Sequence, residues 1–246
     1  MLDAEPVRPG ETECAAALRL LERCRLLYPR FIDALTLDAF YLQAPFVRQA
    51  ASMGYHLVIV LKQENRDLYC DAEGLFKRID PQVINGVDKT IHVWDVDEVA
   101  SWEQLGRSIR VVRQLERHTV RERIAGERVL RNVERDWRWA VISPDGQSGQ
   151  SAELIGKWGH ARWDEETRGF GELTQHWHLN HCYRHHPTAM LSYLLILFLA
   201  FALSTVFFTR NLKPPLREGR TRLSLARLLA DDLALCSTRS FWPRPP

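Results

Sequence analysis

The stretch Phe31-Ile-Asp-Ala-Leu-Thr-Leu-Asp38-Ala-Phe-Tyr-Leu-Gln-Ala-Pro45 decides the fold class of this 246-residue chain. Its apolar residues predict a strand over 31–38 that delivers Asp38 at its end, followed by a turn and a helix over 44–53. The next apolar run, Tyr55-His-Leu-Val-Ile-Val-Leu-Lys62, predicts a second strand over 56–62. A strand, a helix and a further strand are typical of a parallel pair. We therefore expect an α/β fold.

A second informative segment is Ala161-Arg-Trp-Asp-Glu-Glu-Thr-Arg-Gly-Phe170. Arg162 and Glu166 are four residues apart, which places guanidinium and carboxylate on one face of a helix. The simplest interpretation of this pair alone is an ordinary ion pair on a surface helix. The pair follows the strand that carries Asp38 in the chain, and the two segments together are more informative than the pair alone.

These two segments resemble the DDE transposases of bacterial insertion sequences. In that family an apolar strand ends in the second catalytic aspartate, as in Asp38-Ala-Phe-Tyr, and a later helix carries an arginine and the catalytic glutamate at the spacing of Arg162 and Glu166. Gly159 or His160 stands where the family has a tyrosine, and Leu173 where a lysine often follows. The resemblance covers most of the chain, from the N-terminal helix to Arg222. It implies an RNase H-like catalytic core that carries out DNA transposition by phosphodiester cleavage and strand transfer.

The implied chemistry explains the residue types. Phosphodiester cleavage is an in-line displacement that two divalent cations assist by stabilising the attacking and leaving oxygens. Mg²⁺ prefers hard oxygen ligands, so the resemblance assigns two Mg²⁺ ions to a site with Asp38 and Glu166 as ligands. Arg162 would neutralise the carboxylates or hold a phosphate, because its planar fork suits bidentate contact.

The family uses three carboxylates, and the first lies upstream of the second. Before Asp38 the sequence offers only Asp3, in a proline-rich stretch, and Asp33, in the same predicted strand. Residues 33 and 38 point to opposite faces of a strand, because side chains alternate. We therefore expect a core that is incomplete at its N-terminus, with doubtful activity in this chain itself.

The predicted domain organisation follows the changes in pattern. Helices are expected over 11–28 and 67–78, and β-rich runs over 90–96, 109–115 and 137–142. The polar stretch 144–151 predicts a flexible connection. We divide the chain into a first part of the core at 1–84, a β-rich insertion at 85–150, a second part of the core at 151–222 and a C-terminal tail at 223–246.

Basic charge gathers in the predicted insertion, where residues 107–138 hold ten arginines against five acidic residues. Such a patch is typical of contact with DNA phosphates, and Trp102, Trp137 and Trp139 are candidate stacking platforms. The alternative is a solvated β surface with ion pairs across strands. The expected DNA-binding residues are Arg107, Arg110, Arg113, Arg117, Arg121, Arg123, Arg128 and Arg131.

Two further segments each allow two interpretations. His178, His181, Cys182 and His185 would share one face of a helix, so zinc is conceivable, although polar helix packing is the favoured interpretation. Residues 189–208 contain no charge over twenty positions, which is long enough for a membrane span. The transposase resemblance implies instead a buried helix that packs on the strands at 31–38 and 56–62.

The composition fits a mostly soluble protein that handles DNA. A net charge of +2 is too small to indicate nucleic-acid binding by itself, and the five scattered cysteines indicate free thiols in a reducing cytosol. Residues 1–10 contain no apolar run of the kind that a secretory signal has. We expect a cytoplasmic, nucleoid-associated protein whose partners are DNA ends and target DNA, with a homodimer allowed. Two alternatives remain: a single-pass membrane protein anchored by 189–208, and a DNA-binding remnant without catalysis.

Overall fold

The structure is a computed structural model that describes residues 3–62, 66–87, 89–124, 127–146, 149–181 and 184–238. It divides into two compact units. The first is Glu5–Glu166, and the second is Thr167–Pro246 together with Met1–Ala4. Each unit is described separately below.

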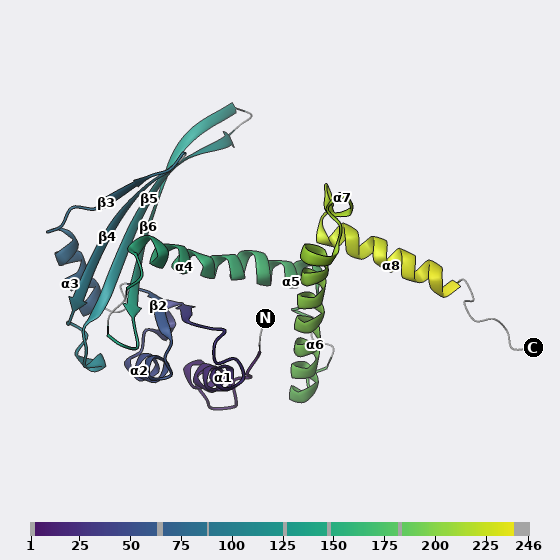
Figure 1. Ribbon diagram of the computed structural model, residues 1–246, viewed down its shortest axis with the longest axis horizontal. Coiled ribbons are helices and arrows are strands. Elements are labelled where there is room, and N and C mark those ends of the chain that lie inside the picture. Colours follow the sequence, from purple (N-terminus) through teal and green to yellow (C-terminus); the bar gives the residue numbers. More distant parts are fainter. Residues whose placement is uncertain are drawn as a thin grey trace, which may run out of the picture. The chain divides into compact units, whose positions relative to one another are not determined.

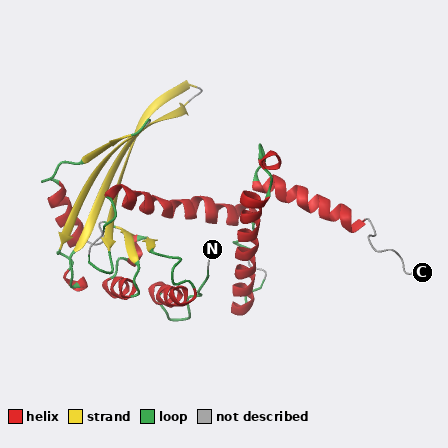
Figure 2. Cartoon of the chain, viewed as in Figure 1, coloured by secondary structure: helices red, strands yellow, loops and turns green. Residues whose placement is uncertain are grey.

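The first unit is built on one mixed sheet of six strands (Figure 2). The strands lie in the order β1-β2-β6-β5-β4-β3; β1 and β2 are parallel, and every other neighbouring pair is antiparallel. An α/β fold with a parallel pair at the predicted strands is therefore confirmed. The strands are β1 (Ala34–Leu37), β2 (His56–Val60), β3 (Gln82–Asn85), β4 (Lys89–Val99), β5 (Ile109–Ile124) and β6 (Glu127–Ile142).

Helices cover both faces of this sheet, because its central strands are apolar on both sides. In β2, Leu57 and Ile59 join one buried cluster and Val58 and Val60 join another, as the alternation of side chains along a strand requires. Three helices contribute to the first cluster and one to the second (Figure 1). They are α1 (Glu13–Leu27), α2 (Ala44–Ser52) and α3 (Arg66–Phe76) on the first face, and α4 (Ala152–Asp164) on the other.

Helix α4 lies unusually close to the sheet because two glycines face it. A Cβ atom at Gly159 would lie 2.8 Å from Cζ2 of Trp139 and closer still to Nε1 and Cε2 of the same indole ring. A Cβ at Gly156 would overlap the side chain of Gln114, which is buried and donates a hydrogen bond to the Ala152 carbonyl oxygen at 3.2 Å. This close approach fixes where the C-terminal end of α4 lies.

The strands of residues 85–150 do not form a separate insertion in the structure. β6 pairs directly with β2, with Leu57 opposite Ile142 and Val60 opposite Trp139. One sheet therefore crosses the predicted boundary at 84/85, and the compact units divide after Glu166 and not at 150/151. The β-rich character of the segment could be predicted from its sequence, but its pairing partner could not.

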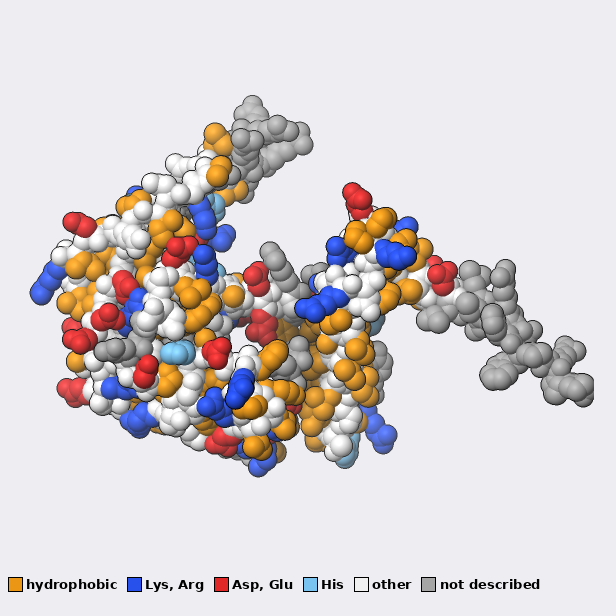
Figure 3. Space-filling model, in the orientation of Figure 1, with side chains coloured by type: hydrophobic (Ala, Val, Ile, Leu, Met, Phe, Trp, Pro, Cys, Tyr) orange, Lys and Arg blue, Asp and Glu red, His pale blue; other side chains and the backbone are white. Residues whose placement is uncertain are grey.

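The second unit is helical. A π-helical turn (Glu165–Phe170) follows α4 and leads to α5 (Gly171–His176), and α6 (Pro187–Val206) continues into a second π-helical turn (Phe207–Asn211). Two helices, α7 (Pro214–Arg217) and α8 (Arg222–Thr238), complete the unit. The expectation of a buried core helix at 189–208 is wrong: within α6 only Leu197 is buried, and hydrophobic side chains cover the visible surface of this helix (Figure 3). A physical reason is that both faces of the sheet already carry helices of the first unit.

Candidate functional site

Asp38 stands directly after β1, where the chain leaves the sheet. Its carboxylate caps a short 3₁₀ turn (Ala39–Tyr41), because Oδ1 accepts a hydrogen bond from the backbone N–H of Phe40 at 3.3 Å. The side chain is 38% exposed, so solvent reaches it. The sequence places this residue where strand ends of α/β proteins carry ligand-binding side chains.

Arg162 connects Asp38 with Glu166. Its Nη2 lies 3.6 Å from Oδ2 of Asp38, and its Nη1 donates a hydrogen bond to Oε1 of Glu166, four residues further along the helix. The guanidinium also lies over the ring of Trp163, with Cζ 5.1 Å from the ring centroid. The structure therefore brings together the three residues that the sequence indicated, although two distant segments supply them.

Lys62 is a fourth charged residue at this site, and the sequence analysis did not identify it. Its Nζ lies 3.6 Å from Oδ1 of Asp38. A signal was present in the sequence: Lys62 ends the predicted strand 56–62, and the carboxyl ends of parallel strands lie at the same edge of a sheet. Asp38 therefore has one cation on each side, Lys62 from its own sheet edge and Arg162 from α4.

Behind the charged residues lie packed aromatic groups, of which Trp139 is buried and Trp137 and His160 are half-buried. The ring of His160 contacts Trp137 and Trp139 edge to face, with centroids 5.4 and 5.3 Å away. Burial lowers the pKa of His160, although Glu116 at 3.3 Å opposes this shift. Nε2 of His160, Nε1 of both indoles and Nε of Arg162 are buried and have no hydrogen-bond partner among the described residues. The exposed carboxylate pair therefore lies beside a layer of packed aromatic rings.

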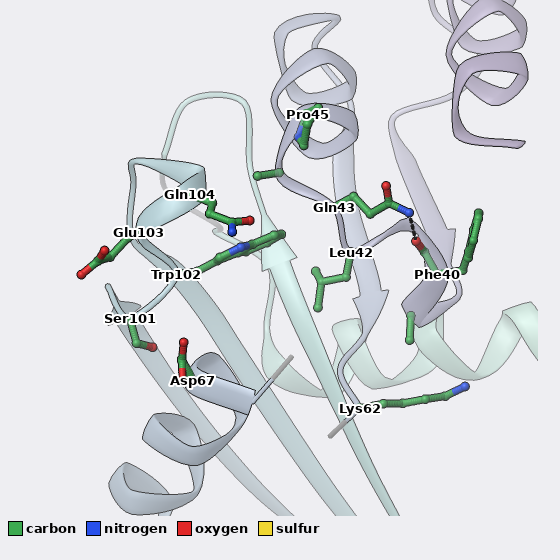
Figure 4. A pocket seen from close by; sticks show the side chains of 12 residues that line it. Phe40, Leu42, Gln43, Pro45, Lys62, Asp67, Ser101, Trp102, Glu103 and Gln104 are labelled. Atoms are coloured by element: carbon green, nitrogen blue, oxygen red, sulfur yellow. Dashed lines mark hydrogen bonds between the residues drawn. The ribbon is translucent and has the colours of Figure 1, made fainter. Parts of the chain in front are cut away.

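A cavity of about 1010 Å³ opens beside Asp38 and begins at the residues that follow it (Figure 4). Lys62 and Phe40 line one side and Asp67, Ser101 and Trp102 the other. Its wall is fixed on one side by Gln43, whose Nε2 donates to the Phe40 carbonyl oxygen at 2.9 Å. Polar and apolar groups share the lining of this open cavity, which includes Ala39, the neighbour of Asp38 in the chain, and Lys62.

The donor set suits a hard cation, but it is small. Asp38 and Glu166 offer carboxylate oxygens, and Mg²⁺ is commonly held by one or two carboxylates together with substrate phosphates and waters. Among the residues that the structure describes, no group of three or more His, Cys, Asp or Glu side chains could hold a metal ion. Asp38 and Glu166 alone would therefore supply only part of the coordination shell of a cation.

The structure separates the predicted DNA-binding arginines into two groups. Those nearest the centre of the sheet are engaged within the protein: Arg110 is buried and makes a bidentate pair with Asp95 at 2.8 and 2.6 Å, and Arg113 makes one with Asp136 at 3.0 and 2.8 Å. Arg107 donates to the Ser143 carbonyl oxygen.

The second group lies further along the same strands. Arg117 is 53% exposed and pairs with Glu134 at 2.7 Å, and Arg131 is exposed. The side chains of Arg121, Arg123 and Arg128 lie outside the described part of the structure. Among the predicted arginines whose side chains the structure describes, Arg117 and Arg131 are therefore the exposed ones.

Two other expectations are not met. Trp102 and Trp139 are buried and Trp137 is half-buried beneath α4, so none of them offers an exposed stacking surface. The continuous helix that both interpretations of the histidine-rich segment assumed is not formed, because α5 ends at His176 and His178 has a left-handed φ of 57°. Cys182 of that segment lies outside the described residues.

In comparisons with known proteins, the chain matches no family model, no curated protein and no solved structure.

Proposed function

We propose that this chain carries the phosphoryl-transfer site of an insertion-sequence transposase on an RNase H-like core, with Asp38 and Glu166 as metal ligands. The observation that supports it best is the contact of one guanidinium, that of Arg162, with both carboxylates. The parallel pairing of β1 and β2, with Asp38 at the carboxyl end of β1, adds support. The proposed substrate is DNA, and the proposed compartment is the cytoplasm.

The proposal assigns Mg²⁺ to the carboxylate pair. When bound, the ion would stabilise the charge that develops on the oxygens around phosphorus. Asp38 and Glu166 would supply oxygen ligands, and both are exposed enough to exchange their present partner for a cation, with side chains 38% and 47% accessible. Two carboxylates are few for two metal ions, so the expected affinity without DNA is weak.

The cations beside the carboxylates have a separate role. Arg162 at present neutralises Asp38 and Glu166, and its fork is suited to a phosphate once a metal ion has taken over the carboxylates. Lys62 would contact the same phosphate from the strand side. The packed aromatic rings hold α4, and therefore Arg162, at a fixed height above the sheet.

The test is Mn²⁺ binding, followed by electron paramagnetic resonance of the full chain with and without DNA. We expect the double variant Asp38→Asn and Glu166→Gln to bind Mn²⁺ at least about tenfold more weakly, which corresponds to about 1.4 kcal/mol. Asp33→Asn is the matched control, because Asp33 is an exposed carboxylate near the same strand. Equal Mn²⁺ binding by the wild type and the double variant would refute the metal site. Magnesium-dependent nicking of DNA, lost in the same double variant, is the second readout.

A second candidate function, membrane anchoring, is favoured by one observation. The helical segment Pro187–Asn211 is 25 residues long and strongly apolar, and 6% of its most apolar window is buried. Twenty helical residues span about 30 Å, which matches the hydrocarbon core of a bilayer. One basic residue, Arg184, precedes this segment, and another, Arg210, lies at its C-terminal end.

Fractionation of cells that express the full chain distinguishes the two candidates. An anchored chain stays in the membrane pellet through high salt and alkaline carbonate, whereas a soluble DNA-handling protein is released. Leu199→Lys, near the middle of the segment, would abolish anchoring, because lysine at a helix centre costs about 2.5–3.5 kcal/mol of insertion free energy. Thr209→Lys, at the end of the segment, is the matched control. Release of the wild-type chain by carbonate would exclude the anchor.

A further inference from the structure

A small hollow lies where α2, the segment between β4 and β5 and the end of β6 meet. Its volume is about 240 Å³, and its lining includes Arg48 and Ser52 of α2 and Arg107 before β5. The buried part of the lining is apolar and consists of Val47, Ala51, Leu105 and Ile142. Pockets for drug-sized ligands usually measure about 300–1,000 Å³, so this hollow suits a single small group.

The two arginines of the hollow are held in place but not neutralised. Arg48 donates a hydrogen bond through Nη1 to the Gln104 carbonyl oxygen, and Arg107 donates one through Nη2 to the Ser143 carbonyl oxygen. A carbonyl oxygen carries no net charge, and the other N–H groups of each guanidinium can bind a further acceptor. Among the described residues, neither guanidinium has an ion-pair partner. An anion between them would remove the repulsion of two like charges that share one hollow.

The other charges around the hollow do not cancel those of the arginines. Among the described residues, no acidic side chain lines it. The opposing effect is the C-terminal end of α2 at Ser52, which is equivalent to about half a negative charge. The carbonyl groups there already have partners: that of Gln49 accepts from Ser52 Oγ at 2.8 Å, and that of Ala51 from the Gly54 N–H at 2.9 Å. Two full positive charges exceed this effect, so the hollow is positively charged.

We propose that this hollow binds a phosphate group through Arg48 and Arg107. The planar fork of a guanidinium matches the oxygens of a phosphate, and hydrogen bonds between charged groups are stronger than those between neutral ones. The buried apolar lining strengthens these interactions, because it lowers the local dielectric constant. The phosphate would belong to a nucleic-acid backbone or to a small phosphorylated molecule.

The hollow is a different place from the carboxylate site. Ile142 in its wall pairs with Leu57, near the start of β2. Asp38 and Lys62 instead follow the carboxyl ends of β1 and β2. The inference therefore requires neither Mg²⁺ nor the two carboxylates, and it can fail while the proposed function stands, or the reverse.

The decisive test changes Ser52, because this residue is exposed in the hollow and its replacement removes neither arginine. Binding of inorganic phosphate to the full chain is measured by phosphorus NMR in EDTA, so a metal ion makes no contribution. Ser52→Glu places a carboxylate beside the arginines, and we expect it to weaken phosphate binding at least about tenfold. Ser52→Gln is the matched control: its side chain has the same size without the charge, and its affinity should remain close to that of the wild type.

The two guanidiniums are tested singly by Arg48→Gln and Arg107→Gln, with Arg30→Gln as an exposed control elsewhere in the unit. Each of the first two should weaken phosphate binding at least about tenfold, because hydrogen bonds to charged groups are the strong ones. Mn²⁺ binding at the carboxylate site should be the same in all these variants as in the wild type.

Fluorescence anisotropy with a labelled DNA duplex identifies the source of the phosphate. If it belongs to DNA, the variants at Arg48 and Arg107 also lower the affinity for the duplex, and the slope of log affinity against log salt falls by about 0.9 for one lost phosphate contact. Unchanged duplex binding together with weaker binding of inorganic phosphate assigns the hollow to a small phosphorylated molecule.

Two results would overturn the proposal. One is equal binding of phosphate and duplex by the wild type, Ser52→Glu and both arginine variants. The other is a wild-type chain that binds neither inorganic phosphate nor the duplex. Should Arg107→Gln fail to fold because it loses the bond to Ser143, the comparison of Ser52→Glu with Ser52→Gln decides alone.

Discussion

Replacement of Gly159 by alanine tests whether α4 is held against the sheet by close packing. The added methyl group would meet the indole of Trp139, which is fully buried, at 2.8 Å from Cζ2 and less from neighbouring ring atoms. Carbon atoms in contact are normally about 3.5–4.0 Å apart, so α4 must retreat by about 1 Å or the indole must turn in a filled core. Overpacking of this kind costs about 1–3 kcal/mol.

A competing effect is the higher helix propensity of alanine, which is worth up to about 1 kcal/mol. We expect overpacking to be the larger effect. The free energy of unfolding should fall by about 1–2 kcal/mol, and the melting temperature by several degrees. Gly74 in α3 is the matched control, because a Cβ atom there would meet nothing within 4 Å. Gly74→Ala should raise stability by about 0.5–1 kcal/mol.

The assay is urea denaturation of both variants and the wild type, followed by tryptophan fluorescence. Opposite signs for the two glycine variants are the expected result. If Gly159→Ala is as stable as the wild type or more so, the packing of α4 against Trp139 is incorrect. Because Arg162 and Glu166 lie on the turns that follow, the same variant should also weaken Mn²⁺ binding.

Three further predictions concern stability. Ser151→Ala should cost about 1 kcal/mol in urea denaturation, because Ser151 Oγ accepts the Leu154 N–H at 3.2 Å and caps α4; an unchanged midpoint would contradict this role. Phe46→Ala should lower the free energy of unfolding by about 3–5 kcal/mol, since the Phe46 side chain of α2 is 2% exposed in the core. A loss below about 1 kcal/mol would show a loosely packed core. Burial lowers the pKa of His160 in the folded chain, so the unfolded chain binds the proton more readily, and stability should fall as pH decreases below the ordinary value of 6.5. The free energy of unfolding stops falling once the pH is below the pKa of His160 in the folded chain. His160→Gln should flatten this part of the curve of stability against pH. An unchanged curve would show that His160 does not cause the pH dependence.

Local patterns in the sequence predicted the individual elements well. The helix expected over 44–53 is α2 (Ala44–Ser52), and the strand expected over 56–62 is β2 (His56–Val60). Turn and helix signals depend on a few neighbouring residues, and the spacing of the apolar residues distinguishes a helix from a strand. The four-residue spacing of Arg162 and Glu166 was informative for the same reason.

Contacts between distant segments were not predictable in this way. The runs predicted at 109–115 and 137–142 are the inner parts of two 16-residue strands, and the polar residues beyond them gave no apolar signal. The antiparallel pairing of β6 with β2 joins segments about eighty residues apart, which no local pattern specifies. The engagement of Arg110 with Asp95 depends on that sheet, so the same arginine-rich sequence was consistent with both a DNA surface and internal ion pairs.

The exposure of α6 has a consequence for any solution of this protein. Ile196, Leu199 and Leu203 are 67%, 60% and 61% exposed, and patches of this kind drive association between molecules in water. The second unit should therefore melt at a temperature that rises with protein concentration, since association stabilises the associated form by mass action. The first unit has its own buried core and should melt independently of concentration. Detergent would shift one transition and leave the other in place, so the stability of the second unit depends on the medium in which it is measured.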